Sequence, residues 1–163
     1  MNTSVINAVS DEHILIVKQL FIEYAQWLGF DLCFQGFESE LASLPGKYSP
    51  PDGRLYLAMA DHTAVGCAGL RKIADGECEM KRLYLRPESR GLGLGKMLIE
   101  QMINDALAIG YKKMLLDTYP PKMGQAVNLY REYGFTETEP YYDNPHKDDG
   151  VLFMELDLTK LKS

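Results

Sequence analysis

The sequence predicts an α/β fold of the α+β type, with a mixed, mostly antiparallel central sheet of six to seven strands flanked by about four helices. Two observations predict it. Three strand-like segments follow one another through short turns between residues 54 and 87, which is typical of an antiparallel meander. Beyond residue 95, helical and strand-like segments alternate, which requires a right-handed crossover between parallel strands. With 163 residues and no repeat or linker, residues 1–163 should form a single domain.

The N-terminal third predicts one strand and two helices. A short strand is expected from Ser4 to Ala8. A helix should begin at Ser10 or Asp11 and continue to about Leu28, because apolar residues recur there at helical spacing. Gly29 then supplies the left-handed end. The stretch "FQGFESELASLPG" suggests a second short helix, which its Pro-Gly pair stops.

The rest of the chain predicts the sheet and two further helices. "RLYLAMA", "AVGCAGLRKIA" and "ECEMKRLYLRP" read as strands joined by the turns "DHT" and "DG". From Gly95 the apolar period becomes helical, and Gly110 ends that helix. "KKMLLDT" predicts a buried strand, "MGQAVNLYREYG" a helix that Gly134 closes, and "GVLFMELDL" the final strand. A short extra strand over residues 135–138 would be the seventh.

Composition and charge limit the class of protein. A hydrophobic content of 46% and a charged content of 25% are those of a soluble globular protein, and no apolar run is long enough to cross a bilayer. The start of the chain lacks the order of a secretory signal. The net charge of −6 argues against a nucleic-acid partner. We therefore expect a reduced, cytoplasmic protein with no membrane partner and no metal. Its three cysteines show no metal-type or redox-type spacing: Cys33, Cys67 and Cys78.

The stretch "RGLGLGK" places three glycines between a strand and a helix. A Walker A loop fails, because Arg90 stands where its first glycine is needed and Met97 follows Lys96. The dinucleotide pattern G-x-G-x-x-G fails as well. What remains is a nest of bare backbone N–H groups at a helix start, which suits a pyrophosphate, with Arg90 able to add a forked contact. A tight turn without a ligand is the alternative. Cations crowd around this loop: Lys81, Arg82, Arg86, Arg90 and Lys96.

Two motifs between residues 79 and 135 resemble the GNAT superfamily of acyl-CoA-dependent N-acetyltransferases. "EMKRLYLRPESRGLGLGKMLIEQMINDAL" is similar to that family's central strand, its R/Q-x-x-G-x-G/A pyrophosphate loop and the following helix. "AVNLYREYGF" is similar to its A-x-x-L-Y-x-x-x-G-F helix. The order of elements over the whole chain agrees. One departure is Met123, which occupies the position of the family's usual asparagine, and Asn128 lies elsewhere on the same helix.

The resemblance implies acetyl-CoA as cosubstrate and a GNAT-like sheet that is splayed at its middle. The strand before the glycine loop would part from "KKMLLDT", and the pantetheine arm would lie along the backbone exposed between them. Transfer to a primary amine would be direct, through a ternary complex. The residues that the resemblance assigns to the cofactor are Leu83, Tyr84, Leu85, Arg90, Gly91, Leu92, Gly93, Leu94, Gly95, Lys96 and Tyr130.

The resemblance also implies the catalytic groups. Tyr130 occupies the position of the family's tyrosine, which would protonate the leaving thiolate; a buried core tyrosine is the alternative. Glu79 is the expected base, because family members often carry a glutamate near this point, and Glu77 is the alternate on the same face of the strand. Glu79 could equally be a solvated strand residue. Cys67 or Cys78 could form an acyl-enzyme, but no histidine lies near them in sequence.

The sequence does not decide the acceptor, which could be a small-molecule amine, an amino acid, an antibiotic or a peptide or protein terminus. In the polar loop "PYYDNPHKDDG", three side chains are candidates to line an acceptor pocket, although ordinary surface structure also explains them: Tyr141, Tyr142 and Asn144. Trp27 could wall the same pocket or pack in the core. An exposed final strand would allow a homodimer. The competing function is a non-catalytic acyl-CoA-binding or sensing module, which needs the glycine loop but neither Tyr130 nor Glu79.

Overall fold

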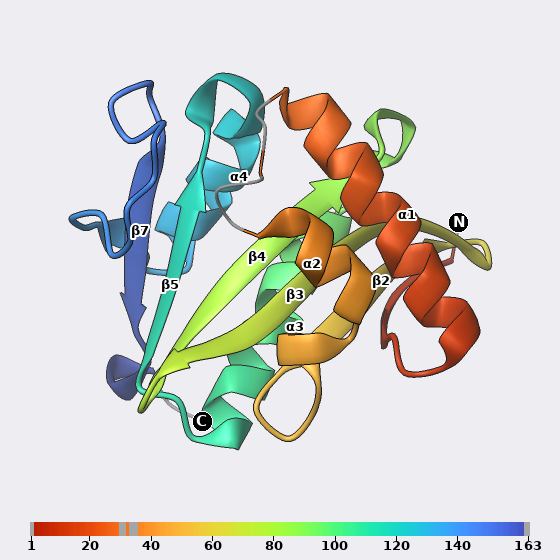
Figure 1. Cartoon of the computed structure of the whole chain (residues 1–163), viewed down its shortest axis with the longest axis horizontal. Coiled ribbons are helices and arrows are strands. Elements are labelled where there is room, and N and C mark those ends of the chain that lie inside the picture. Colours follow the sequence, from red (N-terminus) through yellow and green to blue (C-terminus); the bar gives the residue numbers. More distant parts are fainter. Residues whose placement is uncertain (1, 30–31, 33–35, 162–163) are drawn as a thin grey trace.

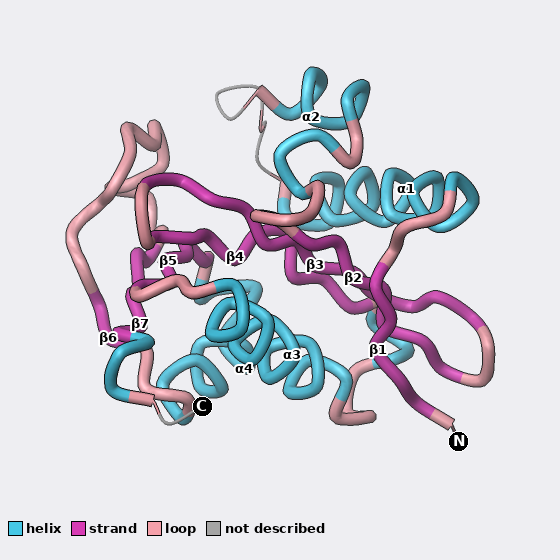
Figure 2. Tube along the Cα trace, turned by 90° about the horizontal axis from the view of Figure 1, so that it is seen from below, coloured by secondary structure: helices cyan, strands magenta, loops and turns pink. Residues whose placement is uncertain are grey.

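The computed structural model describes residues 2–29, 32 and 36–161 (Figure 1). A seven-stranded mixed sheet, in the order β1-β2-β3-β4-β5-β7-β6, has α1 and α2 on one face and α3 and α4 on the other (Figure 2). The strands are β1 Thr3–Asn7, β2 Arg54–Ala60, β3 Thr63–Ala74, β4 Glu77–Leu85, β5 Lys113–Thr118, β6 Thr136–Glu137 and β7 Leu152–Asp157. The helices are α1 Asp11–Leu28, α2 Phe37–Ser43, α3 Leu94–Ile109 and α4 Pro120–Glu132. The predicted fold class is confirmed.

Local sequence signals set most of these boundaries. The Ser10 hydroxyl accepts the His13 N–H at 3.1 Å and so caps α1, while Gly29 ends the helix with φ 81°. The turn between β2 and β3 has two central residues, Asp61 and His62, with φ 48° and 71°, which is the backbone form that two-residue hairpin loops require. α4 begins three residues before the predicted start, and Met123 interrupts its helical backbone with φ −122°.

Strand alternation divides the interior into two apolar layers. Tyr56 and Leu70 point toward α3 and pack in a core with Met102. Their neighbours along the strands point the other way, so that Leu57 packs with Phe21 of α1 in a separate core. The sheet is therefore buried on both faces at its centre. Among the described residues, no helix is both long and apolar enough to span a membrane.

The sheet opens between β4 and β5. These parallel strands pair only at their beginnings, from Glu77 opposite Lys113 to Glu79 opposite Leu115, although both continue beyond that point. On the other side of β4, the register with β3 shifts between Lys81 and Tyr84, and Arg82 has φ 60°. An extra residue of this kind is a β-bulge, which bends its strand. The predicted splay is thus present, and the bend in β4 explains where it starts.

The final strand lies inside the sheet rather than at its edge. β7 pairs with β5 along its whole length, and β6 covers Met154 and Glu155 on the other side. The Thr138 N–H also donates to the Phe153 carbonyl at 2.8 Å. The expectation of an exposed final strand is therefore wrong for this stretch, because the short strand after α4 occupies the edge that a partner would need.

Candidate active site

The loop between β4 and α3 presents a row of unpaired amides. The first helical bond of α3 runs from the Met97 N–H to the Gly93 carbonyl at 3.1 Å. Within the described part of the chain, no backbone N–H from Gly91 to Lys96 has a hydrogen-bond partner. These N–H groups lie at the positive end of the α3 dipole, which favours an anion such as a phosphate. This loop is called the cradle below, and its binding of a pyrophosphate stays a prediction.

The three glycines of the cradle serve different purposes. Gly91 and Gly93 have φ 87° and 80°, and a Cβ at either would meet no protein atom within 4 Å. Backbone conformation, rather than lack of space, therefore requires glycine there. Gly95 is helical, and its Cβ would make ordinary contacts with Leu85 at 3.6 Å and Leu129 at 3.7 Å. Alanine is therefore compatible with position 95 but not with positions 91 and 93.

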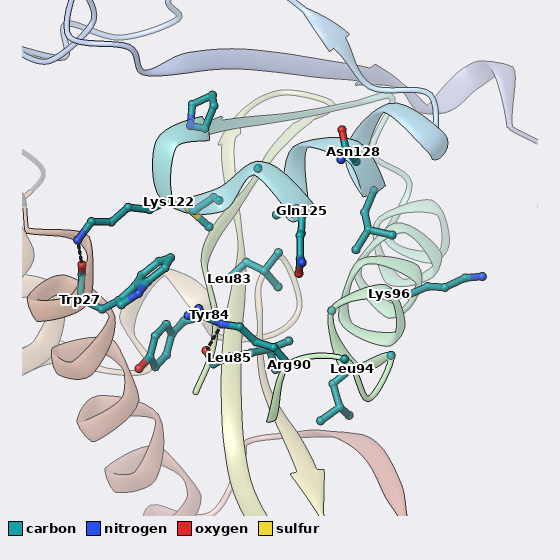
Figure 3. A pocket seen from close by; sticks show the side chains of 18 of the residues that line it. Trp27, Leu83, Tyr84, Leu85, Arg90, Leu94, Lys96, Lys122, Gln125 and Asn128 are labelled. Atoms are coloured by element: carbon teal, nitrogen blue, oxygen red, sulfur yellow. Dashed lines mark hydrogen bonds between the residues drawn. The ribbon is translucent and has the colours of Figure 1, made fainter. Parts of the chain in front are cut away.

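The cradle lies at one end of a cleft of about 840 Å³ between β4, α3 and α4, called the cofactor cleft below (Figure 3). Most of the predicted cofactor residues line it: Leu83, Tyr84, Leu85, Arg90, Gly91, Gly93, Leu94, Gly95 and Lys96. The side chain of Lys96 extends away from the cleft in Figure 3. Two predicted residues do not line it. Leu92 is exposed on the loop, and Tyr130 is buried beside the cleft wall.

Sequence reasoning missed the opposite wall of the cleft. Trp27 lies across from the cradle, with the Arg90 guanidinium 4.8 Å from its ring centroid and Lys122 Nζ 5.7 Å from it. Lys122 also donates to the Trp27 carbonyl, and Arg90 Nε donates to the Leu85 carbonyl at 3.2 Å. Gln125 reaches from α4 toward β4 (Figure 3). These contacts place two cations at the mouth of the cofactor cleft.

Tyr130 is almost fully buried, with 3% of its surface exposed, and its ring packs against Phe135 at 5.5 Å between centroids. Its hydroxyl makes no hydrogen bond with any described residue. Burial raises the pKa of Tyr130 well above its usual value, and the nearby Tyr24 and Asp117 raise it further. The group is therefore a protonated phenol at neutral pH with a free donor.

Glu79 is neither solvated nor free. Its side chain is 2% exposed, and its Oε1 accepts a hydrogen bond from Arg71 Nε at 2.8 Å and lies 2.8 Å from Arg71 Nη2 in an ion pair. Its Oε2 accepts the Tyr141 hydroxyl at 2.5 Å, and Lys81 Nζ lies 4.0 Å from Oε1. Both carboxylate oxygens are therefore held by side-chain donors. The expectation of a solvated strand residue is wrong, because α2 and the loop after β6 cover this part of β4.

The loop after β6 is tied to the sheet on the α1/α2 face. Besides the bond from Tyr141 to Glu79, the Tyr142 hydroxyl donates to Asp117, and Asn144 Nδ2 donates to the same carboxylate at 3.3 Å. The Tyr141 ring packs against Phe153 at 5.7 Å. The three candidate acceptor residues therefore lie beside Glu79 of β4 and Asp117 of β5, and their contact with an acceptor stays a prediction.

The cysteines do not form a nucleophile site among the described residues. Cys67 and Cys78 are buried, and burial raises the pKa of both thiols, that of Cys78 to about 12. A thiol in that state is a poor nucleophile. Cys33 lies outside the described residues. Across the described ranges, no group of three or more His, Cys, Asp or Glu side chains is placed to hold a metal ion.

Lys81 gives a pH-dependent contribution to stability. Burial and the positive charge of Arg82 lower the pKa of Lys81 to about 8, against the opposing effect of Glu79. Above pH 8 the unfolded chain binds more protons at this group than the folded chain, so the free energy of unfolding should rise with pH. Relative to Lys81→Met, we expect the wild type to gain about 2 kcal/mol between about pH 7 and 9.5. Urea unfolding across this range measures it, and parallel curves for the two proteins would contradict it.

Comparison with known proteins adds independent findings. The family model described as "Acetyltransferase (GNAT) family" matches residues 19–135. An uncharacterised N-acetyltransferase of Schizosaccharomyces pombe is 46% identical over 145 residues, which is 88% of this chain and 87% of that protein.

Two solved structures show the same fold. The PaiA N-acetyltransferase of Thermoplasma acidophilum, in complex with coenzyme A, has a TM-score of 0.73 at 21% identity, covering 96% of this chain and 99% of that one. The spermidine N-acetyltransferase of Vibrio cholerae, in complex with CoA and spermine, has a TM-score of 0.69 at 17% identity, covering 97% and 96%.

Proposed function

The chain belongs to the GNAT family of N-acetyltransferases and is an acyltransferase, and from this premise we propose that it transfers an acetyl group from acetyl-CoA directly to a primary amine of a small acceptor. One observation carries the proposal: the unpaired amides from Gly91 to Lys96 lie at the end of a cleft beside the parted strands β4 and β5. The relatives with coenzyme A, and with CoA and spermine, support the choice of cosubstrate and of an amine acceptor.

We assign different parts of acetyl-CoA to different parts of the site according to the strength of the contacts available there. The cradle amides and Arg90 would hold the pyrophosphate, because charge-assisted hydrogen bonds are roughly twice as strong as neutral ones. The backbone of β4 beyond Glu79, which has no β5 neighbour, would hold the pantetheine arm as an added strand. Such positioning can lower a bimolecular barrier by roughly 7–11 kcal/mol.

In the transfer step, the amine nitrogen forms a bond to the acetyl carbon and the carbon–sulfur bond of the thioester breaks. The amine loses a proton and coenzyme A leaves as a thiolate that gains one. In this proposal the Tyr130 phenol, which is buried beside the cleft wall, donates a hydrogen bond to that thiolate. An alkyl thiol has a pKa of about 8.5, well below the pKa of this phenol, so complete proton transfer from Tyr130 to the thiolate would be unfavourable. We therefore assign Tyr130 the stabilisation of the leaving thiolate, with water completing the protonation.

Glu79 takes a different part in this proposal. Because Arg71 and Tyr141 hold its carboxylate, it orients these two side chains beside the acceptor and does not itself remove the proton. The acceptor can enter the site as its minor neutral form, in which the amine already lacks the extra proton. The proton that the nitrogen loses on acetylation then passes to water.

Calorimetry with acetyl-CoA tests the cradle. We expect saturable binding to the wild type, about tenfold weaker binding for Gly93→Ala, and at least that loss for Arg90→Glu, because the first change disturbs the amides and the second reverses a charge. Gly95→Ala is the matched control and should bind within about threefold of wild type, since its methyl group fits the helix.

Release of free thiol with a panel of amines then tests turnover. Absence of acetyl-CoA binding would refute the proposal that the cradle holds the pyrophosphate of acetyl-CoA. Binding without thiol release would favour the acyl-CoA-binding module over the transferase.

A further inference from the structure

A second cavity lies on the opposite face of the sheet from α3 and α4. It has a volume of about 240 Å³ and lies between α2, the short 3₁₀ turn Gly46–Tyr48 and β3. It shares no lining residue with the cofactor cleft. The side chains that give it chemical character are Ser39, Glu40, Lys47, Tyr48 and Arg71.

Tyr48 contributes a buried donor without a partner. The residue is 2% exposed, and its hydroxyl has no hydrogen-bond partner among residues 2–29, 32 and 36–161. Its ring is fixed by packing: it lies so close to Gly69 that a Cβ there would meet Tyr48 Cε1 at 2.6 Å, and it meets Phe21 edge-on at 5.9 Å between centroids. The charged groups that act on the hydroxyl include Glu40, Arg82 and Arg71. Buried hydroxyls are nearly always paired in folded proteins, so an exception indicates a missing partner.

Arg71 contributes further donors. Its Nε and Nη2 both go to Glu79, whereas its Nη1 has no partner among the described residues. Its side chain is 22% exposed and lines the cavity. Glu40, the one carboxylate among the described lining residues, has both oxygens occupied by Arg82 at 3.1 Å. Arg71 Nη1 can only donate, the Tyr48 hydroxyl can donate as well as accept, and the Lys47 ammonium adds another donor to the lining.

The cavity is connected to the opening of the sheet through one ion pair. Arg71 is the cross-strand partner of Glu79, and Glu79 is the last residue of β4 that pairs with β5. On the far side, Glu79 is held by Tyr141. A group bound at Arg71 and Tyr48 would thus lie on the acceptor side of the sheet, next to the point where the strands part.

We propose that this cavity binds a carboxylate of the acceptor, so that the acceptor is an amine that also carries a carboxylate, such as an amino acid or the C-terminal residue of a short peptide. The inference rests on the proposed transfer to an amine and names its substrate class. A carboxylate would accept from the Tyr48 hydroxyl and from Arg71 Nη1, which supplies the partner that each lacks. A polyamine would bring only donors and positive charge to the same groups.

Matched acceptors test the proposal. Thiol release is measured with α-, β- and γ-amino acids, with their carboxamides, with short peptides and with spermidine. We expect kcat/KM at least tenfold higher for a carboxylate than for its carboxamide, because a site built of donors discriminates strongly against a group that cannot accept equally. The preferred chain length separates a free amino acid from a peptide end.

Tyr48→Phe then tests the site itself. It removes only the unpaired hydroxyl, so the free energy of unfolding should stay equal or rise. The ratio of kcat/KM for carboxylate over carboxamide should fall about tenfold. Tyr111→Phe is the control, because it removes a buried hydroxyl that donates to the Asp52 carbonyl, remote from the cavity, and should leave the ratio unchanged.

The outcomes separate the two proposals. If carboxamides or spermidine react as well as carboxylates, or if Tyr48→Phe leaves the ratio unchanged, the carboxylate assignment is overturned while the transferase stands. If no amine releases thiol, the proposed acetyl transfer is refuted. Calorimetry of amino acids and of their amides, with the CoA-loaded protein, then tests carboxylate binding in the cavity independently of turnover. Binding of the carboxylate that is lost in Tyr48→Phe supports the site, and equal binding of both forms refutes it.

Discussion

Replacement of Tyr130 by Phe should lower kcat by about 10²-fold or more while the affinity for acetyl-CoA changes less than twofold. The reason is that its hydroxyl is a free donor in a buried environment, where a hydrogen bond to developing negative charge is worth most. In the ground state this hydroxyl bonds to no described residue, so its removal should not destabilise the protein. Single-turnover measurement of thiol release, with calorimetry for the affinity, gives both quantities.

Tyr133→Phe is the matched control for this prediction. Tyr133 lies one turn from Tyr130 on the chain, and its hydroxyl donates to Glu100 at 2.5 Å on the outer side of the α3–α4 contact. Its loss should leave kcat within about twofold, since the group touches neither cleft. Equal kcat for Tyr130→Phe and wild type would remove Tyr130 from the transfer step.

Replacement of Glu79 by Gln should lower the free energy of unfolding by about 3 kcal/mol, because removing one partner of a buried ion pair leaves the other charge uncompensated. Arg71 would lose its ion-pair partner, and the buried Lys81 would lose a carboxylate 4.0 Å from its Nζ. If Glu79 orients Arg71 and Tyr141, as proposed, kcat should fall less than tenfold at a temperature at which the variant is folded. Urea unfolding and thiol release measure the two effects.

Glu77→Gln provides the comparison for Glu79. Glu77 lies two residues earlier on the same strand and face but is half-buried at the strand start, so its replacement should change stability by no more than about 0.5 kcal/mol. A general base typically contributes about 10²–10⁴-fold. If kcat of the folded Glu79→Gln variant falls by that factor, Glu79 is the base that removes the amine proton.

Local signals in the sequence were enough for the elements and for the glycine loop. Ser10, Gly29 and Gly110 act through bonds and backbone angles within a few residues, so their consequences are visible without the fold. The cradle is also local, since it needs only positive φ at Gly91 and Gly93 before a helix. For this reason the predicted cofactor loop lines the cleft almost completely.

The acceptor side depended on contacts that no local pattern contains. Trp27 and Lys122 meet across 95 residues of sequence, and Tyr141 reaches Glu79 across 62. The Asp75-Gly76 turn pairs Ala74 with Glu77, but the register then shifts between Lys72 and Ala74, and this shift places Arg71 opposite Glu79. The position of the last strand could not be predicted for the same physical reason: the short strand near residues 135–138 was expected, but its pairing with β7 is a contact that no local pattern contains.

The short pairing between β4 and β5 decides what keeps the two halves of the molecule together. In the described part of the chain, β4 and β5 pair only from Glu77 to Glu79, so cohesion must come mainly from the apolar layer in which Met102 of α3 clusters with buried residues of both strands. The distance between the parted strands is then set partly by the volume of side chains such as Met102 that do not line the cofactor cleft. Cosubstrate affinity should accordingly respond to methyl groups far from any phosphate.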